Sequence, residues 1–199
     1  MWDERYATDE YVYGTRPNDF LAEQISGVLP GKALCLAEGE GRNAVFLAER
    51  GFDVLAVDSS SVGLEKAERL ATQRHVAIRT EVADLTDYSI QPNRWDLVVS
   101  IFCHLPPDTR RRLHREAVAG LRPGGRFILE GYTPAQLALG TGGPPTEALM
   151  MNLPELRDEL TGLEFIHAVE VERDVVEGVF HTGRGAVVQI HACKPAEPG

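Results

Sequence analysis

The chain has 199 residues, of which 43% are hydrophobic and 25% charged, and 20 basic residues against 30 acidic ones give a formal net charge of −10. This balance is typical of one globular domain with a substantial core, and its sign argues against general affinity for nucleic-acid phosphates. No apolar run has the length of a membrane span, and the polar start, MWDERYATDE, is unlike a signal peptide, so we expect a cytoplasmic protein.

Strand-like and helix-like segments alternate along the chain after a polar, aromatic leader. The expected helices are Phe20–Leu29, Asn43–Arg50, Val62–Gln73 and Thr109–Leu121. The expected strands are Ala33–Ala37, Val54–Val57, Val76–Glu81, Leu97–Ile101, Arg126–Glu130, Glu164–Val171 and Gly185–Ala192. Such alternation predicts a parallel sheet with helices on both faces. Only a turn-like stretch separates the last two strands, which indicates a closing antiparallel hairpin.

Two residue types are expected to play ordinary structural roles. Cys35, Cys103 and Cys193 are widely spaced and form no metal-ligand pattern, so neither a metal site nor a disulfide framework is indicated. The basic run Arg110-Arg111-Arg112 lies on an expected helix and is interpreted as a solvated helix face.

The most informative stretch joins the first two expected strands. The first strand ends in Gly39 and Gly41 ahead of a helix, and the second strand ends in Asp58. Glycines let a ligand approach the backbone, the helix N-terminus offers N–H donors, and a carboxylate accepts hydrogen bonds from ribose hydroxyls. The layout predicts a nucleotide-type pocket. Because Gly39-x-Gly41-x-x-Ala44 also satisfies the dinucleotide fingerprint, NAD stays open as the ligand on this pattern.

Five segments in order resemble the class I S-adenosylmethionine-dependent methyltransferases, and more narrowly the small group related to the tellurite-resistance and thiopurine methyltransferases. These segments are AEGEGRN (37–43), AVDSS (56–60), VADL (82–85), WDLVVSIFCHLP (95–106) and LRPGGRFILEGY (121–132). The resemblance runs from Tyr11 to Ala192. It implies a doubly wound α/β, Rossmann-like sheet of seven mostly parallel strands with a C-terminal antiparallel hairpin. The closing hairpin is unusual for NAD-binding folds.

The resemblance also implies that S-adenosyl-L-methionine lies across the strand ends. By position, the methionine part would lie above Glu38, Gly39 and Gly41 and would be faced by Ser100 and Phe102. The ribose would be held by Asp58. The adenine would lie beside Ser59, and its amino group would donate to Asp84, with Leu85 next to it. The aromatic leader with Tyr11 resembles the family's lid, since aromatic faces attract a sulfonium; packing against the sheet is the alternative.

The chain departs from the family in its first motif. The usual acid aligns with Cys35, and Ala37 and Glu38 replace a glycine and a cysteine. We hypothesise that Glu38 takes over contact with the cationic amino group of the cofactor. The tetrapeptide of amino-methylating nucleic-acid enzymes is replaced by SIFCHLP, which argues against DNA or RNA bases as acceptor.

Residues near the expected cleft are the candidates for chemistry. His104, after the fourth strand, is either a general base or a loop cap, and Tyr132 ends the fifth strand near Glu130, which is either a buried acid or a substrate contact. His181 and Arg184 lie at the hairpin tip, in an ordinary turn or against the acceptor. The glycine-rich stretch 140–145 is interpreted as a mobile flap.

These observations lead to one expected organisation and three open functions. Residues 1–199 would form one domain: a lid and helix (1–30), a cofactor-binding core (31–132), a flap and hairpin (133–193) and a disordered tail (194–199). The expected reaction is methyl transfer to a small-molecule thiol, selenium or tellurium compound, without metal, nucleic acid or membrane partners. The alternatives are an O- or N-methyltransferase with His104 as base and a non-catalytic cofactor binder. The oligomeric state stays open.

Overall fold

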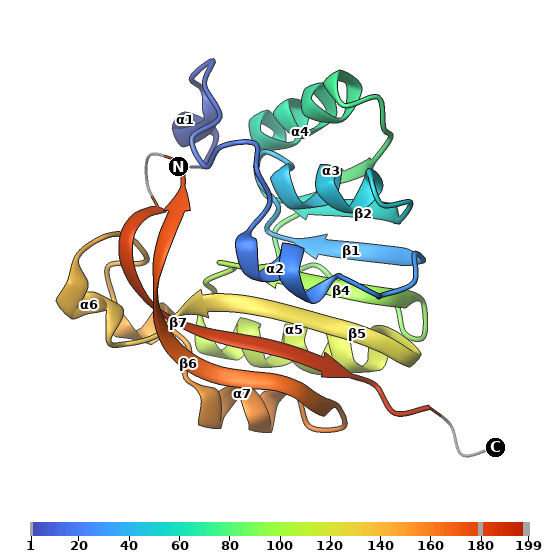
Figure 1. Ribbon diagram of the computed structural model, residues 1–199, viewed down its shortest axis with the longest axis vertical. Coiled ribbons are helices and arrows are strands. Elements are labelled where there is room, and N and C mark those ends of the chain that lie inside the picture. The colour runs from blue at the N-terminus through green and yellow to red at the C-terminus, as the bar shows by residue number, and fades with distance from the viewer. Residues whose placement is uncertain (1, 179–180, 197–199) are drawn as a thin grey trace.

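One seven-stranded sheet forms the centre of the molecule. The computed structural model describes residues 2–178 and 181–196, and its strands lie in the order β3-β2-β1-β4-β5-β7-β6 (Figure 1). The strands are β1 (Lys32–Leu36), β2 (Asp53–Asp58), β3 (Arg79–Val82), β4 (Trp95–Ile101), β5 (Leu121–Tyr132), β6 (Glu164–Glu177) and β7 (His181–Cys193). Strands β1 to β5 pair in parallel, whereas β7 is antiparallel to β5 and β6. The expected fold class is confirmed.

Helices cover both faces of the sheet. They are α1 (Trp2–Tyr6), α2 (Asp19–Gln24), α3 (Arg42–Ala48), α4 (Ser61–Gln73), α5 (Pro107–Gly120), α6 (Gln136–Leu139) and α7 (Leu153–Glu159), with a 3₁₀ turn η1 (Glu147–Leu149). Helices α2, α3 and α4 lie on one face, and α5 and α7 lie on the other (Figure 1). None of the helices in the described ranges has the length and apolar character needed to cross a membrane.

The boundaries differ from expectation mainly near loops. Strand β6 continues to Glu177, and strand β7 begins at His181. Most of the turn-like stretch expected between the last two strands is therefore strand. Helix α2 stops at Gln24 rather than at Leu29, because Gly27 takes a φ of 80°, outside the helical region. Helices α1, α6 and α7 span no more than seven residues, which is too short for a periodic pattern to reveal.

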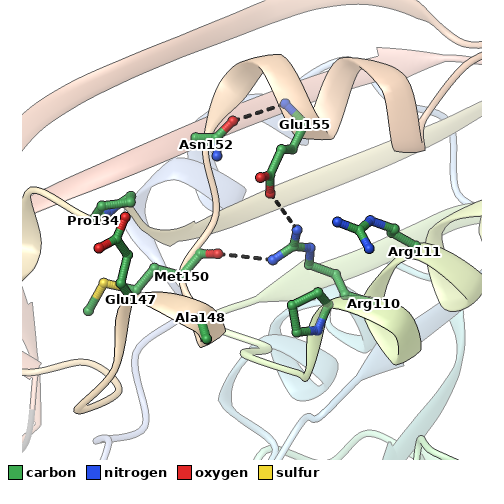
Figure 2. Close-up of a pocket in the computed structure, with 9 residues that line it drawn as sticks. Arg110, Arg111, Pro134, Glu147, Ala148, Met150, Asn152 and Glu155 are labelled. Atoms are coloured by element: carbon green, nitrogen blue, oxygen red, sulfur yellow. Dashed lines mark hydrogen bonds and ion pairs between the residues drawn. The ribbon is translucent and has the colours of Figure 1, made fainter.

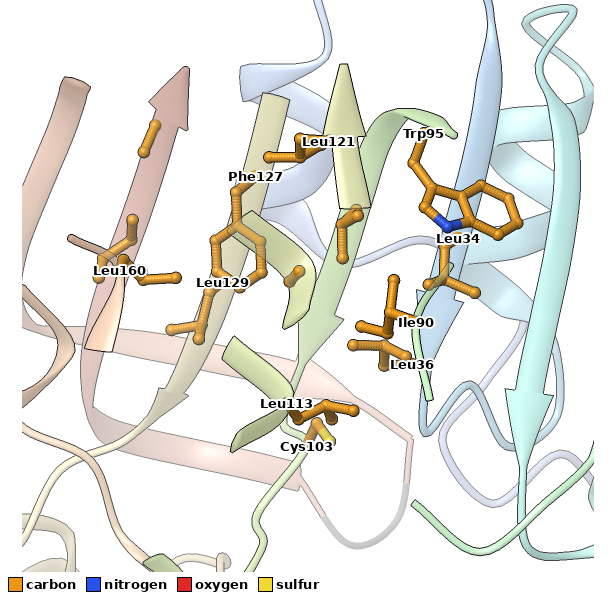
Figure 3. Close-up of a cluster of buried hydrophobic side chains, with 14 of the residues drawn as sticks. Leu34, Leu36, Ile90, Trp95, Cys103, Leu113, Leu121, Phe127, Leu129 and Leu160 are labelled. Atoms are coloured by element: carbon orange, nitrogen blue, oxygen red, sulfur yellow. The ribbon is translucent and has the colours of Figure 1, made fainter. Parts of the chain in front are cut away.

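Side chains from alternate positions of the strands form one apolar cluster on each face. On β5, Phe127 and Leu129 join the cluster beneath α5 and α7, whereas Ile128 joins the cluster beneath α2 and α3. Figure 3 shows Phe127 and Leu129 in the first cluster, which also contains Trp95 from β4. Because helices cover both faces of the sheet, the sequences of the central strands are nearly continuous apolar runs.

Arg110 corrects the expectation of a fully solvated basic helix face. Its side chain is only 1% exposed and forms ion pairs with Glu155 at 2.7 Å and Glu159 at 2.8 Å. Its Nη1 also donates to the Met150 carbonyl at 2.9 Å. Arg111 is half exposed, as expected. Arg110 therefore ties α5 to α7 beneath the sheet.

Replacing Phe127 with Ala should destabilise the fold by about 3–5 kcal/mol, because the side chain is fully buried and its removal leaves a cavity. Urea unfolding followed by circular dichroism would measure the change. The control is Leu29→Ala at a position that is 85% exposed, where we expect a change within about 0.5 kcal/mol. Equal effects of the two substitutions would contradict this account of the core.

Candidate active site

The chain turns sharply after β1, at the carboxyl end of the strand. Ala37, Gly39 and Gly41 all take positive φ, at 50°, 60° and 89°. Positive φ is open to glycine but strains alanine, so Ala37 stores strain at this turn. A Cβ on Gly41 would lie 2.4 Å from the Cβ of Ala67 on α4. Glycine is therefore required here for α3 and α4 to approach each other. We refer to residues 37–41 as the glycine turn.

Asp58 lies against the glycine turn, as the sequence predicts. Its carboxylate accepts hydrogen bonds from the amides of Gly39 and Ser60, both at 2.8 Å. Burial raises the pKa of Asp58, whereas these bonds from backbone amides lower it. Asp58 thus fixes the turn while presenting a carboxylate at the carboxyl ends of β1 and β2, where open α/β sheets bind ligands.

Glu38 has a structural role that sequence reasoning did not anticipate. One carboxylate oxygen accepts from the amides of Asn43 at 2.9 Å and Ala44 at 2.7 Å, in the first turn of α3. Burial raises the pKa of Glu38 to about 7, although these amide bonds lower it. Burial and the nearby Glu38 in turn raise the pKa of the Cys35 thiol. The hypothesised contact between Glu38 and a cofactor amino group stays a prediction.

The residues expected around the adenine and methionine differ in exposure. Ser59 and Asp84 are exposed, and the Asp84 carboxylate accepts from the Thr86 amide at 2.8 Å, which lowers its pKa. Leu85 is buried within the apolar cluster beneath α5, and Ser100 is buried at the end of β4. Asp84 is therefore the more accessible of the two candidate adenine contacts that follow β3.

Phe102, His104 and Tyr132 form an aromatic group where β4 and β5 end. The ring centroids of Phe102 and Tyr132 lie 4.7 Å apart, and those of His104 and Tyr132 lie 5.8 Å apart. His104 Nδ1 lies 2.9 Å from the Leu149 carbonyl, so Nδ1 carries the proton, and Nε2 accepts from the Tyr132 amide at 3.3 Å. Burial lowers the pKa of His104 to about 4. The imidazole is therefore neutral at pH 7 with both nitrogens engaged.

A buried group of charged and polar side chains, the central polar cluster, lies beside this aromatic group. Its members are Asn18, Arg42, Glu130, Arg173, Glu177 and Gln189. Arg173 forms ion pairs with both Glu130 and Glu177, and Arg42 pairs with Glu177. Burial raises the pKa of Glu177, but Arg42 and Arg173 outweigh it and hold this pKa below its usual value. Glu130 is fully buried, and its partners are the side chains of Asn18, Arg173 and Gln189. A substrate contact at Glu130 stays a hypothesis.

Comparison with known proteins finds methyltransferases among the relatives of this chain. Residues 33–125 match the family model described as a methyltransferase domain. A protein of Mycobacteroides abscessus named 2-heptyl-1-hydroxyquinolin-4(1H)-one methyltransferase is 26% identical over 141 residues, which are 69% of this chain. The family match and this relative support a class I S-adenosylmethionine-dependent methyltransferase. The matched region spans 60% of the length of that relative.

Two solved structures share the fold of this chain. One is a structure from work on the conversion of a disulfide bond into a thioacetal group during echinomycin biosynthesis. It has a TM-score of 0.75 and 20% identity, and the match covers 100% of this chain and 92% of that one. TehB from Haemophilus influenzae also has a TM-score of 0.75, with 18% identity over 97% of this chain and 65% of TehB. At these identities, the likeness is one of fold.

The residues at the glycine turn fit the cofactor of this family, S-adenosylmethionine. Asp58 and Asp84 are acceptors suited to a ribose diol and an adenine amino group. Gly39 and Gly41 take positive φ in the turn that leads into α3. The chemistry of the side chains thus matches the polar groups of the cofactor.

The N-terminal segment of the chain packs on the glycine turn. Tyr6 is buried, with its ring against Gly63 and its hydroxyl against Gly39. A Cβ added to Gly39 would lie 2.6 Å from the Tyr6 hydroxyl. The Tyr11 hydroxyl donates to the Lys66 carbonyl at 3.0 Å, and its expected contact with the cofactor stays a prediction. Of the two aromatic residues, Tyr6 is the one that reaches the turn, and sequence reasoning did not single it out.

The flap and the hairpin are tied together. The buried Gln136 side chain donates to Thr141 Oγ1 at 3.0 Å and accepts from the Ala186 amide at 2.9 Å. The Thr141 hydroxyl in turn donates to the Arg184 carbonyl at 2.5 Å. The Arg184 side chain is half exposed and pairs with Glu172. The backbone of His181 begins β7, but its side chain lies outside the described residues.

A cavity of about 390 Å³ lies between α5, α7 and the chain around η1. It is lined by Pro107, Arg110, Arg111, Pro134, Glu147, Ala148, Met150, Asn152 and Glu155. Figure 2 shows Arg110 held between the Glu155 carboxylate and the Met150 carbonyl. The residues that line this cavity do not include the glycine turn.

Several residues of the site carry signals that sequence reasoning overlooked. Lys66 falls on the apolar stripe of α4, between Leu64 and Ala67, where a charged residue needs a partner. Arg42 follows the second glycine of the turn directly. The partners of both residues lie far away in sequence, so only the fold reveals them.

The raised pKa of Glu38 predicts a pH-dependent stability. Between pH 4.5, its ordinary pKa, and about 7, the folded chain keeps a proton that the unfolded chain releases, so stability falls as the pH rises through this range. Glu38→Gln keeps an oxygen for the two amides and should remove this part of the slope in urea unfolding between pH 5 and 8. The control is Glu65→Gln on the exposed face of α4. A slope unchanged by Glu38→Gln would contradict the prediction.

Proposed function

We propose that the chain transfers a methyl group from S-adenosylmethionine to a small-molecule acceptor. The observation that carries this proposal is the hydrogen bond between the Gly39 amide and Asp58, which joins the glycine turn to the acid at the ends of β1 and β2. The family match over residues 33–125 supports it. The net charge of −10 supports a small acceptor over a nucleic acid.

Each residue has a distinct role in this proposal. The bound cofactor supplies an electrophilic methyl group on a sulfonium sulfur. Asp58 accepts hydrogen bonds from the ribose, and Phe102 and Tyr132 turn aromatic faces to the positive charge. Arg42 has a buried Nη1 with no hydrogen-bond partner among the described residues, which makes it the candidate donor to an anionic ligand oxygen. The protein thus acts chiefly by positioning donor and acceptor.

The state of His104 supports an acceptor that needs no general base. Its nitrogens are both engaged and its pKa is about 4, so it is poorly placed to remove a proton. A thiolate, selenide or telluride arrives with its lone pair exposed, forms the new bond to carbon as the carbon–sulfonium bond breaks, and leaves S-adenosylhomocysteine. The description of one structural neighbour by a reaction at sulfur points the same way.

An oxygen or nitrogen acceptor is the second candidate. It is favoured by the relative named as a methyltransferase of a hydroxyquinolinone, in which the hydroxyl group is borne by nitrogen. In this case His104 would have to give up the Tyr132 amide to act as base. The two candidates therefore differ in what His104 contributes to turnover.

Calorimetric titration should show saturable binding of S-adenosylmethionine and of S-adenosylhomocysteine. Asp58→Asn should weaken both by about tenfold or more, because a charged acceptor of the ribose is lost. The matched control is Asp53→Asn at the other end of β2, where Asp53 pairs with Arg79 at the surface. Absence of binding to the unmodified chain would overturn the proposed function.

His104→Gln separates the two acceptor classes. With a soft nucleophile, we expect kcat to change by no more than about threefold, since the side chain supplies no proton transfer. Initial rates with thiol, selenium and tellurium acceptors would measure this effect. A fall of about 100-fold or more with unchanged cofactor affinity would instead identify His104 as the base.

A further inference from the structure

Lys66 on α4 is a lysine with almost no access to solvent. Its side chain is 1% exposed, and its Nζ lies 2.5 Å from the Glu40 carboxylate. The same Nζ donates to the carbonyl oxygens of Glu10 at 2.6 Å, Thr8 at 3.0 Å and Tyr6 at 3.4 Å. One ammonium group thus binds three carbonyls of the N-terminal segment and one acid of the glycine turn.

Glu40 completes the connection from the other side. It lies between Gly39 and Gly41, is almost fully buried, and its second oxygen accepts from the Tyr13 amide at 3.2 Å. The Lys66–Glu40 pair therefore contacts the N-terminal segment at both ends of residues 6–13.

The buried Lys66–Glu40 pair depends on the N-terminal segment for its stability. Desolvation of two charges costs several kcal/mol per ion, and the attraction within the pair has to offset this cost. The Glu40 oxygen that faces Lys66 has no further partner among the described residues, so it depends on the lysine charge. Here most of the partners of Lys66 are backbone carbonyls of a single segment, 56 to 60 residues away in sequence. Displacement of that segment would expose Lys66 and break these bonds together.

We propose that Lys66 and Glu40 are positioning residues that seat residues 6–13 on the glycine turn, and that cofactor binding and this seating stabilise each other. The proposal rests on the proposed function for the identity of the ligand. Tyr6 packs on Gly39, so a ligand held by Gly39 and Asp58 lies next to the seated segment. Because coupling is reciprocal, the ligand favours the seated state as much as seating favours the ligand.

Lysine labelling of the full chain tests this proposal. The chain has three lysines, Lys32, Lys66 and Lys194, and an amine-reactive anhydride followed by peptide mass spectrometry gives the rate at each one. We expect saturating S-adenosylhomocysteine to slow labelling of Lys66 by about fivefold or more, because it favours the seated state, while Lys32 and Lys194 do not change. An unchanged Lys66 rate in a sample whose binding is verified by calorimetry would overturn the coupling.

A variant tests the ion pair without any ligand. Glu40→Gln should speed labelling of Lys66 by about tenfold or more, because the remaining lysine charge is buried without its partner. Glu65→Gln on the exposed face of α4 is the control and should leave all three rates unchanged. A Lys66 rate unaffected by Glu40→Gln would overturn the positioning role.

The two arms separate this proposal from the proposed function. If S-adenosylhomocysteine does not bind at all, the proposed function fails, and the Glu40→Gln arm still decides the role of the ion pair. If Glu40→Gln unfolds the chain, all three lysines are labelled quickly. In that case the effect of S-adenosylhomocysteine on Lys66 labelling in the unmodified chain decides whether the proposal holds.

Discussion

The central polar cluster is the constraint on which the arrangement of this fold depends. Arg42 begins α3, Glu130 lies two residues before the end of β5, and Glu177 ends β6, yet their charges lie together away from water. Each buried charge is tolerable only while its partner stays in place, because an unpaired ion in the interior is strongly destabilising. The start of α3, the last residues of β5 and the end of β6 therefore hold fixed positions relative to one another.

A second buried pair acts on the opposite side of the glycine turn. Lys66 and Glu40 join α4 and the turn to the first residues of the chain, whereas Asn18 joins the end of the same segment to Glu130 and Glu177. The N-terminal segment is thus held by buried polar contacts at both ends. Between them lie the glycine turn and Asp58, so the proposed cofactor site is bordered by polar connections that specify geometry more than they add stability.

The sequence predicts the sheet and the glycine turn well because both depend on local signals. Apolar runs bounded by glycine or proline mark the strands, and the spacing of Gly39 and Asp58 places them at neighbouring strand ends. It does not predict the burial of Arg110 or Lys66, since a charged residue on a helix is usually solvated and their partners lie about 40 to 60 residues away. The role of His104 was left open for the same reason, because its partner Leu149 belongs to a short turn without periodic signal.

The hydrogen bond from Asn18 to Glu177 joins residues 159 positions apart and has a consequence for biosynthesis. The segment that carries Asn18 leaves the ribosome well before the strand that carries Glu177. Contacts so distant in sequence form only after loop-closure entropy has been overcome, which slows folding. The segment around Asn18 therefore reaches its native place only after β6 has been made, and until then its aromatic side chains are open to other partners.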